Sequence, residues 1–301
     1  MKISLIVPVH NEEGNVPIVY QEAKAVLETL KSSKGYQYEI IFVNDGSTDK
    51  TLEILKELKK NDPFLRILNM DRNRGEAAGL TAGFQKATGD IIVSMDGDGQ
   101  NDPKYIKDLI EKLETGYKVA TGFRLKRKEN FWIRVLPSRI ANWLISVFTG
   151  LKVRDNGCSL KAYLSPIPKK YQIPHGFHRF LPALFGVKNE EVCEVPIVDR
   201  PRIYGKSHYN LKRTFEVLRE LITIPFVLRN AWFYEKFFKI NFWASIGMGI
   251  ILLVLAVKFS PKFWVLEFFN LGYTSICYLI WKNLTRFNQA QKEGVFQVEE
   301  I

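Results

Sequence analysis

The first 125 residues alternate short apolar runs with segments whose apolar residues recur at helical spacing. Strands are expected over residues 3–9, 39–43, 65–69, 91–95 and 118–122, and helices over residues 16–31, 48–60, 75–87 and 103–115. This alternation predicts βαβ units, and hence an α/β domain with a mostly parallel sheet flanked by helices. Ligands of such domains bind at the carboxyl ends of the strands, so the residues that follow each strand are the first candidates for a site.

Two aspartates separated by a glycine follow the fourth expected strand, in the sequence Asp96-Gly97-Asp98-Gly99-Gln100. At a turn, two such carboxylates can face one hard cation, which prefers oxygen ligands, and the Gln100 amide can add another oxygen. The glycines would let the backbone approach a diphosphate closely. We therefore predict a Mg²⁺ or Mn²⁺ site at Asp96, Asp98 and Gln100.

Two other interpretations of this segment fail on spacing. An EF-hand loop needs glycine at its sixth place and glutamate at its twelfth, where this chain has Asn101 and Lys107. A dinucleotide-binding fingerprint needs a third glycine where Asp102 stands. Taken alone, the segment is also compatible with an ordinary acidic turn.

Polar clusters also follow the first three expected strands: His10-Asn11-Glu12-Glu13, Asn44-Asp45-Gly46-Ser47-Thr48-Asp49 and Asp71-Arg72-Asn73-Arg74-Gly75. Because the carboxyl ends of parallel strands meet at one edge of a sheet, a nucleotide could lie along these clusters. Asp45 could accept a hydrogen bond from a base, and Glu12 could bind a ribose hydroxyl. Four polar clusters at strand ends favour a ligand site over an isolated acidic turn.

Two long apolar stretches near the C-terminal end predict a membrane anchor. Residues 240–257 carry no charge over 18 residues, and residues 263–281 carry one, Glu267, over 19 residues. Each stretch is long enough to cross a hydrocarbon core, and the connector between them is short. We expect a catalytic domain at 1–210, juxtamembrane amphipathic helices at 211–239 broken by Pro225, a transmembrane hairpin at 240–283 and a cytoplasmic tail at 284–301. A buried hairpin in a soluble protein is the alternative.

The N-terminal residues do not have the pattern of a signal peptide, because the apolar run at residues 3–7 is short and is closed by Pro8. An even number of spans would then leave both ends of the hairpin with the catalytic domain in the cytoplasm. We therefore expect a multi-pass protein of the cell inner membrane. Three scattered cysteines fit a reducing compartment and indicate neither a disulfide framework nor a zinc site.

A formal net charge of +11 suits an anionic partner. Residues 124–154 contain eight Lys and Arg against one acid, and within them residues 131–149 predict a basic, aromatic-rich helix of the kind found at membrane interfaces. An ordinary surface helix of a basic protein is the alternative. We expect no nucleic acid as a partner, since no nucleic-acid motif is present, and the sequence leaves a homo-oligomer open.

The residues 7–13, 44–49 and 96–100 together resemble the nucleotide and metal motifs of family 2 glycosyltransferases with the GT-A fold. This resemblance covers roughly the first 125 residues. It implies a catalytic role for Asp98 and nucleotide contacts from Pro8, Val9, Asn11, Glu12, Asp45, Ser47, Asp96 and Gly97.

The second half is similar to polyprenyl-phosphate glycosyltransferases, a group that includes dolichyl-phosphate mannose synthases and undecaprenyl-phosphate glucosyltransferases. The similar segments are Arg134-x-x-x-Ser138, residues 155–159, 194–196 and 202–211. The resemblance implies that Arg134 and Ser138 contact the lipid phosphate, that Arg202 contacts donor or acceptor phosphates, and that Asp155 lies near the acceptor. Arg202 and Asp155 are therefore, with Asp98, the candidate catalytic residues. Arg124 and Lys206 are further candidates for the acceptor phosphate, because an anionic acceptor needs cations beside an anionic donor.

The expected activity is the metal-dependent, inverting transfer of a hexose from a UDP- or GDP-sugar to a polyprenyl monophosphate at the cytoplasmic membrane face. Such an acceptor is already an anion and needs no general base. One alternative is a membrane-bound glycosyltransferase that extends a growing saccharide, although the Q-x-x-R-W element of such synthases is missing. Another is a non-catalytic membrane module with a vestigial glycosyltransferase domain. The sequence leaves the sugar, the base and the roles of His178 and Arg179 open.

Overall fold

The computed structural model describes residues 1–125, 136–201, 204 and 211–301, and over 136–142 and 211–215 it describes the backbone alone. The chain divides into two compact units. Met1–Asn210 and Gly294–Ile301 form the first unit, and Leu211–Glu293 form the second.

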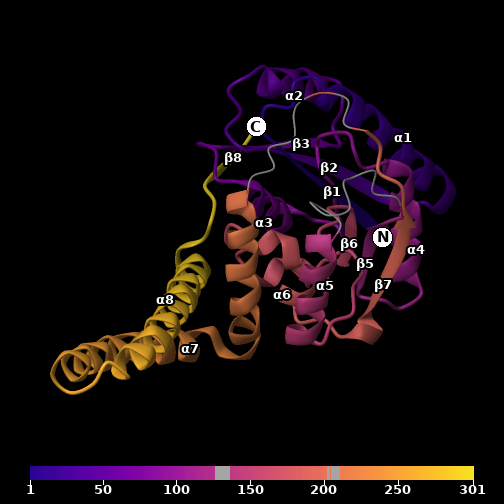
Figure 1. The fold of residues 1–301 in the computed structure, drawn as a ribbon. Helices are drawn as coiled ribbons and strands as arrows, with labels where there is room; N and C mark the ends of the chain where they lie inside the picture. Colours follow the sequence, from indigo (N-terminus) through magenta and orange to yellow (C-terminus); the bar gives the residue numbers. More distant parts are fainter. Residues whose placement is uncertain (126–135, 202–203, 205–210) are drawn as a thin grey trace. The chain divides into compact units, whose positions relative to one another are not determined.

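The first unit is built on an eight-stranded sheet in the order β7-β5-β6-β4-β1-β2-β3-β8 (Figure 1). Four pairs of neighbouring strands are parallel: β1 with β2, β1 with β4, β2 with β3, and β5 with β7. Three pairs are antiparallel: β6 with β4, β6 with β5, and β8 with β3. The strands are β1 (Lys2–Val9), β2 (Gln37–Asn44), β3 (Leu65–Met70), β4 (Ile91–Ser94), β5 (Val119–Arg124), β6 (Lys161–Leu164), β7 (Val192–Ile197) and β8 (Val298–Glu300). The sheet is therefore mixed, with a parallel centre that carries the expected site.

Helices cover both faces of this sheet (Figure 1). The helices α1 (Val16–Lys34), α2 (Thr51–Lys60) and α4 (Ile106–Glu114) share one buried core with alternate residues of β1 and β2. On α1, the core-facing residues recur every three or four positions, which confirms the predicted apolar stripe: Val19, Ala23, Leu27 and Leu30. α3 (Glu76–Lys86) packs on the opposite face.

All five expected strands are present, and three further strands were not expected. β6 and β7 carry residues that interrupt an apolar run, namely the buried Lys161 and Pro196, which has no N–H to donate. β8 consists of only three residues, two of which are glutamates. Short strands that contain charges or proline lack the alternation from which a strand is predicted.

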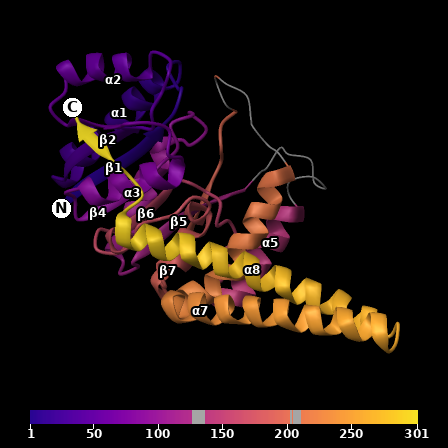
Figure 2. The ribbon, with the colours of Figure 1, turned by 90° about the vertical axis from the view of Figure 1, so that its left-hand side faces the viewer.

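The C-terminal residues return to the sheet. Val298 pairs with Met70, and the Ile301 N–H donates to the Ile67 carbonyl at 3.0 Å. Figure 2 shows β8, in yellow, beside the indigo and purple strands of the N-terminal half. Residues 284–301, expected to be a tail, are thus divided between the end of α8 at Glu293 and this strand.

A buried carboxylate joins β8 to the centre of the sheet. Glu39 on β2 accepts from the Ser4 hydroxyl at 2.5 Å, the Thr88 N–H at 2.7 Å and the Arg66 guanidinium at 2.8 Å. The same guanidinium donates to both carboxylate oxygens of Glu300, at 2.6 and 3.0 Å. Burial alone would raise the pKa of Glu39, but these hydrogen bonds outweigh it and lower the pKa to about 2.

The second unit is a pair of long helices, α7 (Leu211–Lys258) and α8 (Phe263–Glu293). Both are long and apolar enough to cross a membrane. In the most apolar stretch of 18 residues in each helix, only 22% (α7) and 17% (α8) is buried within the protein. α7 leaves helical geometry at Asn230 and not at Pro225. The Asn230 side chain accepts from the Phe233 N–H at 3.0 Å, so it caps the second part of the helix.

Candidate functional site

The loops that follow β1 and β2 are locked together by hydrogen bonds. The Asn11 N–H donates to the Ser47 hydroxyl at 3.0 Å, and the Asn11 side-chain oxygen accepts from the Thr48 N–H at 2.8 Å. Among the described residues, Asn11 is the one non-glycine residue with a positive φ, of 56°. Strained backbone of this kind persists where the surroundings enforce it and is common at binding sites.

Asp45 ties the loop after β2 to the loop after β3. Its buried carboxylate accepts from the Arg74 N–H at 2.6 Å and from the Gly75 N–H at 2.8 Å. The neighbouring Gly46 has a φ of 59°, and a Cβ at that position would lie 2.4 Å from the Arg72 carbonyl carbon. Asp45 therefore shapes the edge of the site, and its contact with a base remains a prediction.

Glu12 lies in the loop between β1 and α1, and neighbouring side chains hold it in place. Its carboxylate accepts from the Asn15 amide at 2.5 Å, and its N–H donates to the Thr51 hydroxyl at 2.9 Å. Glu12 therefore lies next to the hydrogen bond between Asn11 and Ser47, because it directly follows Asn11 in the chain. Its predicted contact with a ribose is untested by the structure.

The acidic turn after β4 packs directly on the end of β1. A Cβ at Gly97 would lie 2.3 Å from the Val9 side chain and 3.1 Å from the Pro8 carbonyl oxygen, so no larger residue fits there. Asp98 is buried, and its carboxylate accepts from the Gln100 N–H at 3.0 Å. The turn thus sits among the ends of the parallel strands, as the sequence predicted.

Carboxylates crowd this turn. Burial, Glu76 and Asp98 together raise the pKa of Asp96 above its ordinary value. In the described part of the chain, no three His, Cys, Asp or Glu side chains already surround one metal position. The set still fits a Mg²⁺- or Mn²⁺-like ion, because such ions are often held by one or two carboxylates and take their other ligands from water and substrate phosphates.

Arg124, at the end of β5, is engaged within the protein. Its Nε and Nη2 donate to the two carboxylate oxygens of Asp155 at 2.7 and 2.9 Å, and its Nη1 lies 3.7 Å from Asp199. Asp155 is 5% exposed. Arg124, predicted to bind the acceptor phosphate, and Asp155, predicted to be catalytic, therefore form one bidentate ion pair in which the carboxylate is buried and the guanidinium is partly exposed.

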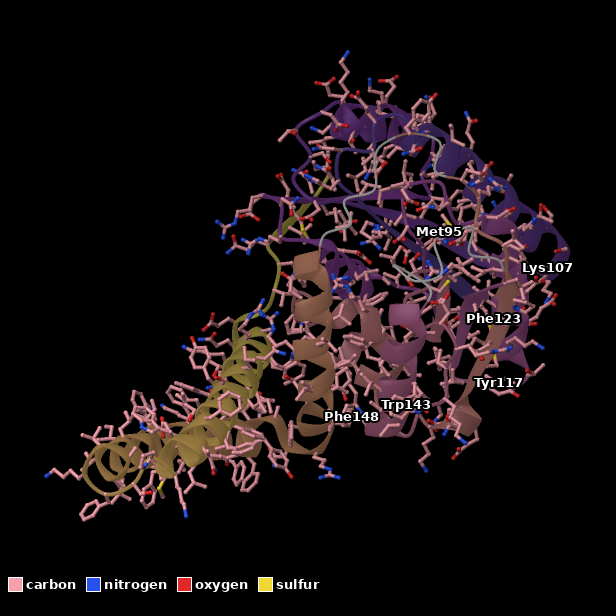
Figure 3. All side chains as sticks on the ribbon, in the orientation of Figure 1. Met95, Lys107, Tyr117, Phe123, Trp143 and Phe148 are labelled. Carbon is pink, nitrogen blue, oxygen red and sulfur yellow. The ribbon has the colours of Figure 1, made fainter. Side chains whose placement is uncertain are left out.

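The other predicted contacts to phosphate are Arg134, Arg202 and Lys206, and all three lie outside the described residues. Ser138 lies on α5 (Leu136–Thr149), in the part where only the backbone is described. Further along α5, Trp143 and Phe148 are exposed, as Figure 3 shows, whereas Ile145 is buried. The described part of α5 is thus partly exposed, and its place at a membrane interface stays a prediction.

Sequence reasoning missed several residues of the site. Glu76 begins α3, and its carboxylate lies 3.5 Å from the buried His178 imidazole. Lys161 is 2% exposed, and its ammonium donates to the Asn156 carbonyl at 3.1 Å. Asn101 directly follows the predicted metal motif. That position next to the motif could have identified Asn101 from the sequence, whereas no such signal marks Glu76 or Lys161.

Comparisons with known proteins agree with this geometry. Residues 4–166 match the model of "Glycosyl transferase family 2". The chain is 36% identical over 262 residues to the dodecaprenyl-phosphate galacturonate synthase of Rhizobium johnstonii, covering 85% of this chain and 75% of that protein.

Solved structures establish the fold. Glucosyl-3-phosphoglycerate synthase from Mycobacterium tuberculosis, solved with Mn²⁺, UDP-glucose and phosphoglyceric acid, superposes with a TM-score of 0.54 at 19% identity, over 75% of this chain and 78% of that one. S. aureus TarS, solved with UDP-GlcNAc, gives a TM-score of 0.52 at 17% identity, over 98% and 88%. With its family match, its relative and its GT-A-like fold, the chain is a glycosyltransferase that belongs to glycosyltransferase family 2.

Proposed function

We propose that this protein transfers one sugar from a nucleoside-diphosphate sugar to a polyprenyl monophosphate, at the cytoplasmic face of the cell inner membrane. The observation that carries the proposal is the acidic turn after β4, in which the buried Asp98 follows Gly97 and Gly97 packs on the end of β1. The apolar helices α7 and α8 supply the setting for a lipid acceptor. The relative that makes a dodecaprenyl-phosphate galacturonate indicates the acceptor class and adds a hexuronate to the possible donor sugars.

The donor site would lie across the ends of β1, β2 and β4. Asn11 and Ser47 shape one side of it, and the Asp96–Asp98 turn shapes the other. Asp96, Asp98 and Gln100 would hold the divalent metal. When bound, Mg²⁺ or Mn²⁺ would supply positive charge that stabilises a departing nucleoside diphosphate.

The acceptor phosphate would attack the anomeric carbon in line with the leaving diphosphate, and such a displacement inverts the anomeric configuration. A polyprenyl phosphate is an anion at neutral pH, so this step needs no general base. It needs cations that hold two anions together, and Arg134, Arg202 and Lys206 with Ser138 remain the candidates. Arg124 is already paired with Asp155. We therefore assign to this pair the role of shaping the acceptor side of the site, in addition to any contact of Arg124 with the phosphate.

The test is transfer by the full chain in lipid nanodiscs that contain undecaprenyl phosphate. UDP-glucose, UDP-galacturonate and GDP-mannose are supplied in turn with MnCl₂, with MgCl₂ or with EDTA, and lipid products are identified by mass spectrometry. We expect one donor to give a glycosylated lipid only when a metal is present.

Asp98→Ala should abolish product formation, whereas Asp108→Ala, an exposed acid on α4, should leave it unchanged. Full activity of the Asp98 variant, or of the wild type in EDTA, would refute the metal role. The absence of any lipid product, together with release of free sugar, would instead point to a different acceptor.

A further inference from the structure

Asn101 lies at the centre of a hydrogen-bond network that runs away from the acidic turn. It is 6% exposed, and its side-chain oxygen accepts from the Asp96 N–H at 3.2 Å and from the Ser159 hydroxyl at 2.7 Å. Its amide nitrogen donates to Asp199 at 3.4 Å. One side chain therefore joins three separate segments of the chain.

The same turn holds the segment around Asp199 at two more points. The Arg200 N–H donates to the Gln100 carbonyl at 2.8 Å, and the Arg200 guanidinium lies 2.9 Å from the Asp102 carboxylate. Asp199 in turn lies 3.7 Å from Arg124, which is paired with Asp155. Hydrogen bonds and ion pairs thus connect the metal-binding turn with the residues on the acceptor side.

Asparagine suits this position for a chemical reason. A planar amide presents an acceptor and a donor in a fixed geometry. The Asp96 N–H can only donate, so the Asn101 oxygen must face it, and the Asn101 nitrogen therefore faces the Asp199 carboxylate. An aspartate at position 101 would keep the acceptor but lose the donor, and it would face Asp199 with a like charge.

We propose that Asn101 is a positioning residue, which couples the metal-binding turn of the donor site to Asp199, Arg200 and the Arg124–Asp155 pair on the acceptor side. Occupation of the turn by nucleotide and metal then holds Asp199 and Arg200 in place. This inference rests on the proposed function for the identity of the two sides. The coupling itself is a property of the described contacts and can be measured without any transfer.

The first measurement is hydrogen exchange of the full chain in nanodiscs, with and without UDP and MnCl₂, read from the peptide that contains Arg200. In the wild type, the ligands should slow exchange of the Arg200 amide about tenfold, since they stabilise the carbonyl to which it is bonded. Asn101→Ala and Asn101→Asp should lose this protection. Lys107→Ala, which Figure 3 shows at the outer edge of the domain, is the control and should keep it.

The decisive variant is a swap. Combining Asn101→Asp with Asp199→Asn exchanges donor and acceptor across the same contact, so protection of the Arg200 amide should return to within about threefold of the wild type. Such a rescue would show that the pairing of a donor with an acceptor across this contact, and not the identity of either side chain, carries the coupling. The swap also keeps the test valid if Asn101→Ala does not fold.

Transfer assays then show what the coupling does. Asn101→Asp should bind UDP with Mn²⁺ within about threefold of the wild type, but kcat/KM for the lipid acceptor should fall at least tenfold, which corresponds to about 1.4 kcal/mol. Retained protection in Asn101→Asp, or equal losses for donor and acceptor with no rescue by the swap, would overturn the inference. If the wild type shows the protection but makes no lipid product with any donor, the proposed function fails and the coupling stands.

Discussion

Replacing Glu39 by glutamine should destabilise the first unit by an amount that the structure allows us to estimate. The buried Glu39 carboxylate accepts hydrogen bonds from Ser4, Thr88 and Arg66, and these lower its pKa to about 2 from the ordinary value of 4.5. Each tenfold change in proton affinity corresponds to about 1.4 kcal/mol. The ionised carboxylate therefore contributes about 3 kcal/mol to the free energy of unfolding at neutral pH. Glu39→Gln removes that contribution.

The pH dependence follows from the direction of the shift. The folded state binds the Glu39 proton more weakly than the unfolded state, so the contribution is complete above pH 4.5 and is lost as the pH falls through 2. At pH 3, less than half of the difference between wild type and Glu39→Gln should remain. Pulse proteolysis in urea, with thermolysin at pH 7 and pepsin at pH 3, measures both differences in the full chain in detergent.

The matched control is Glu57→Gln. Glu57 is 67% exposed and pairs with Lys60 on the surface of α2, so its loss should change the free energy of unfolding by less than about 0.5 kcal/mol. A cost for Glu39→Gln that is equal at pH 7 and pH 3, or that is below about 1 kcal/mol at pH 7, would refute the reasoning. The stability of the first unit would then depend on the size and neutral hydrogen bonds of the side chain at position 39, and not on its charge.

Three further variants test other contacts. Arg124→Ala should cost about 3–5 kcal/mol, because it leaves Asp155 buried beside Asp199, and adding Asp155→Ala should recover part of that cost in a double-mutant cycle of urea midpoints. Gly97→Ala should weaken UDP binding at least tenfold in calorimetry, because its Cβ would displace Val9, and an unchanged affinity would show that the turn can move away from β1. Asn230→Ala should lower helix stability by about 1 kcal/mol through loss of the cap, seen as faster hydrogen exchange at Phe233, whereas exchange unchanged from the wild type would show that the cap is dispensable.

The sheet centre could be predicted from the sequence because its strands are continuous apolar runs between amphipathic helices. The edges could not be predicted. β6 begins with Lys161, whose buried ammonium donates to the Asn156 carbonyl, and no local pattern reveals that partner. β8 pairs with β3 across more than two hundred residues, which no local periodicity can show.

The site was predictable in position but not in its internal bonding. The rule that ligands bind at the carboxyl ends of parallel strands located the four polar clusters. It did not show that Asp45 accepts from two backbone N–H groups of the loop after β3, or that Arg124 pairs with Asp155, 31 residues away. Such pairings depend on tertiary distances, so the same residues that suggested ligand contacts also hold the loops in place.

The return of the chain at β8 makes the apolar hairpin an insertion within the catalytic fold. A soluble version that ends at residue 210 would discard β8 and leave β3 as an open edge, a common cause of aggregation. Joining residue 210 to residue 294 through a flexible linker would retain the eighth strand and the Arg66–Glu300 pair. The natural chain also passes between the two units twice, so two covalent connections, and not one, join them.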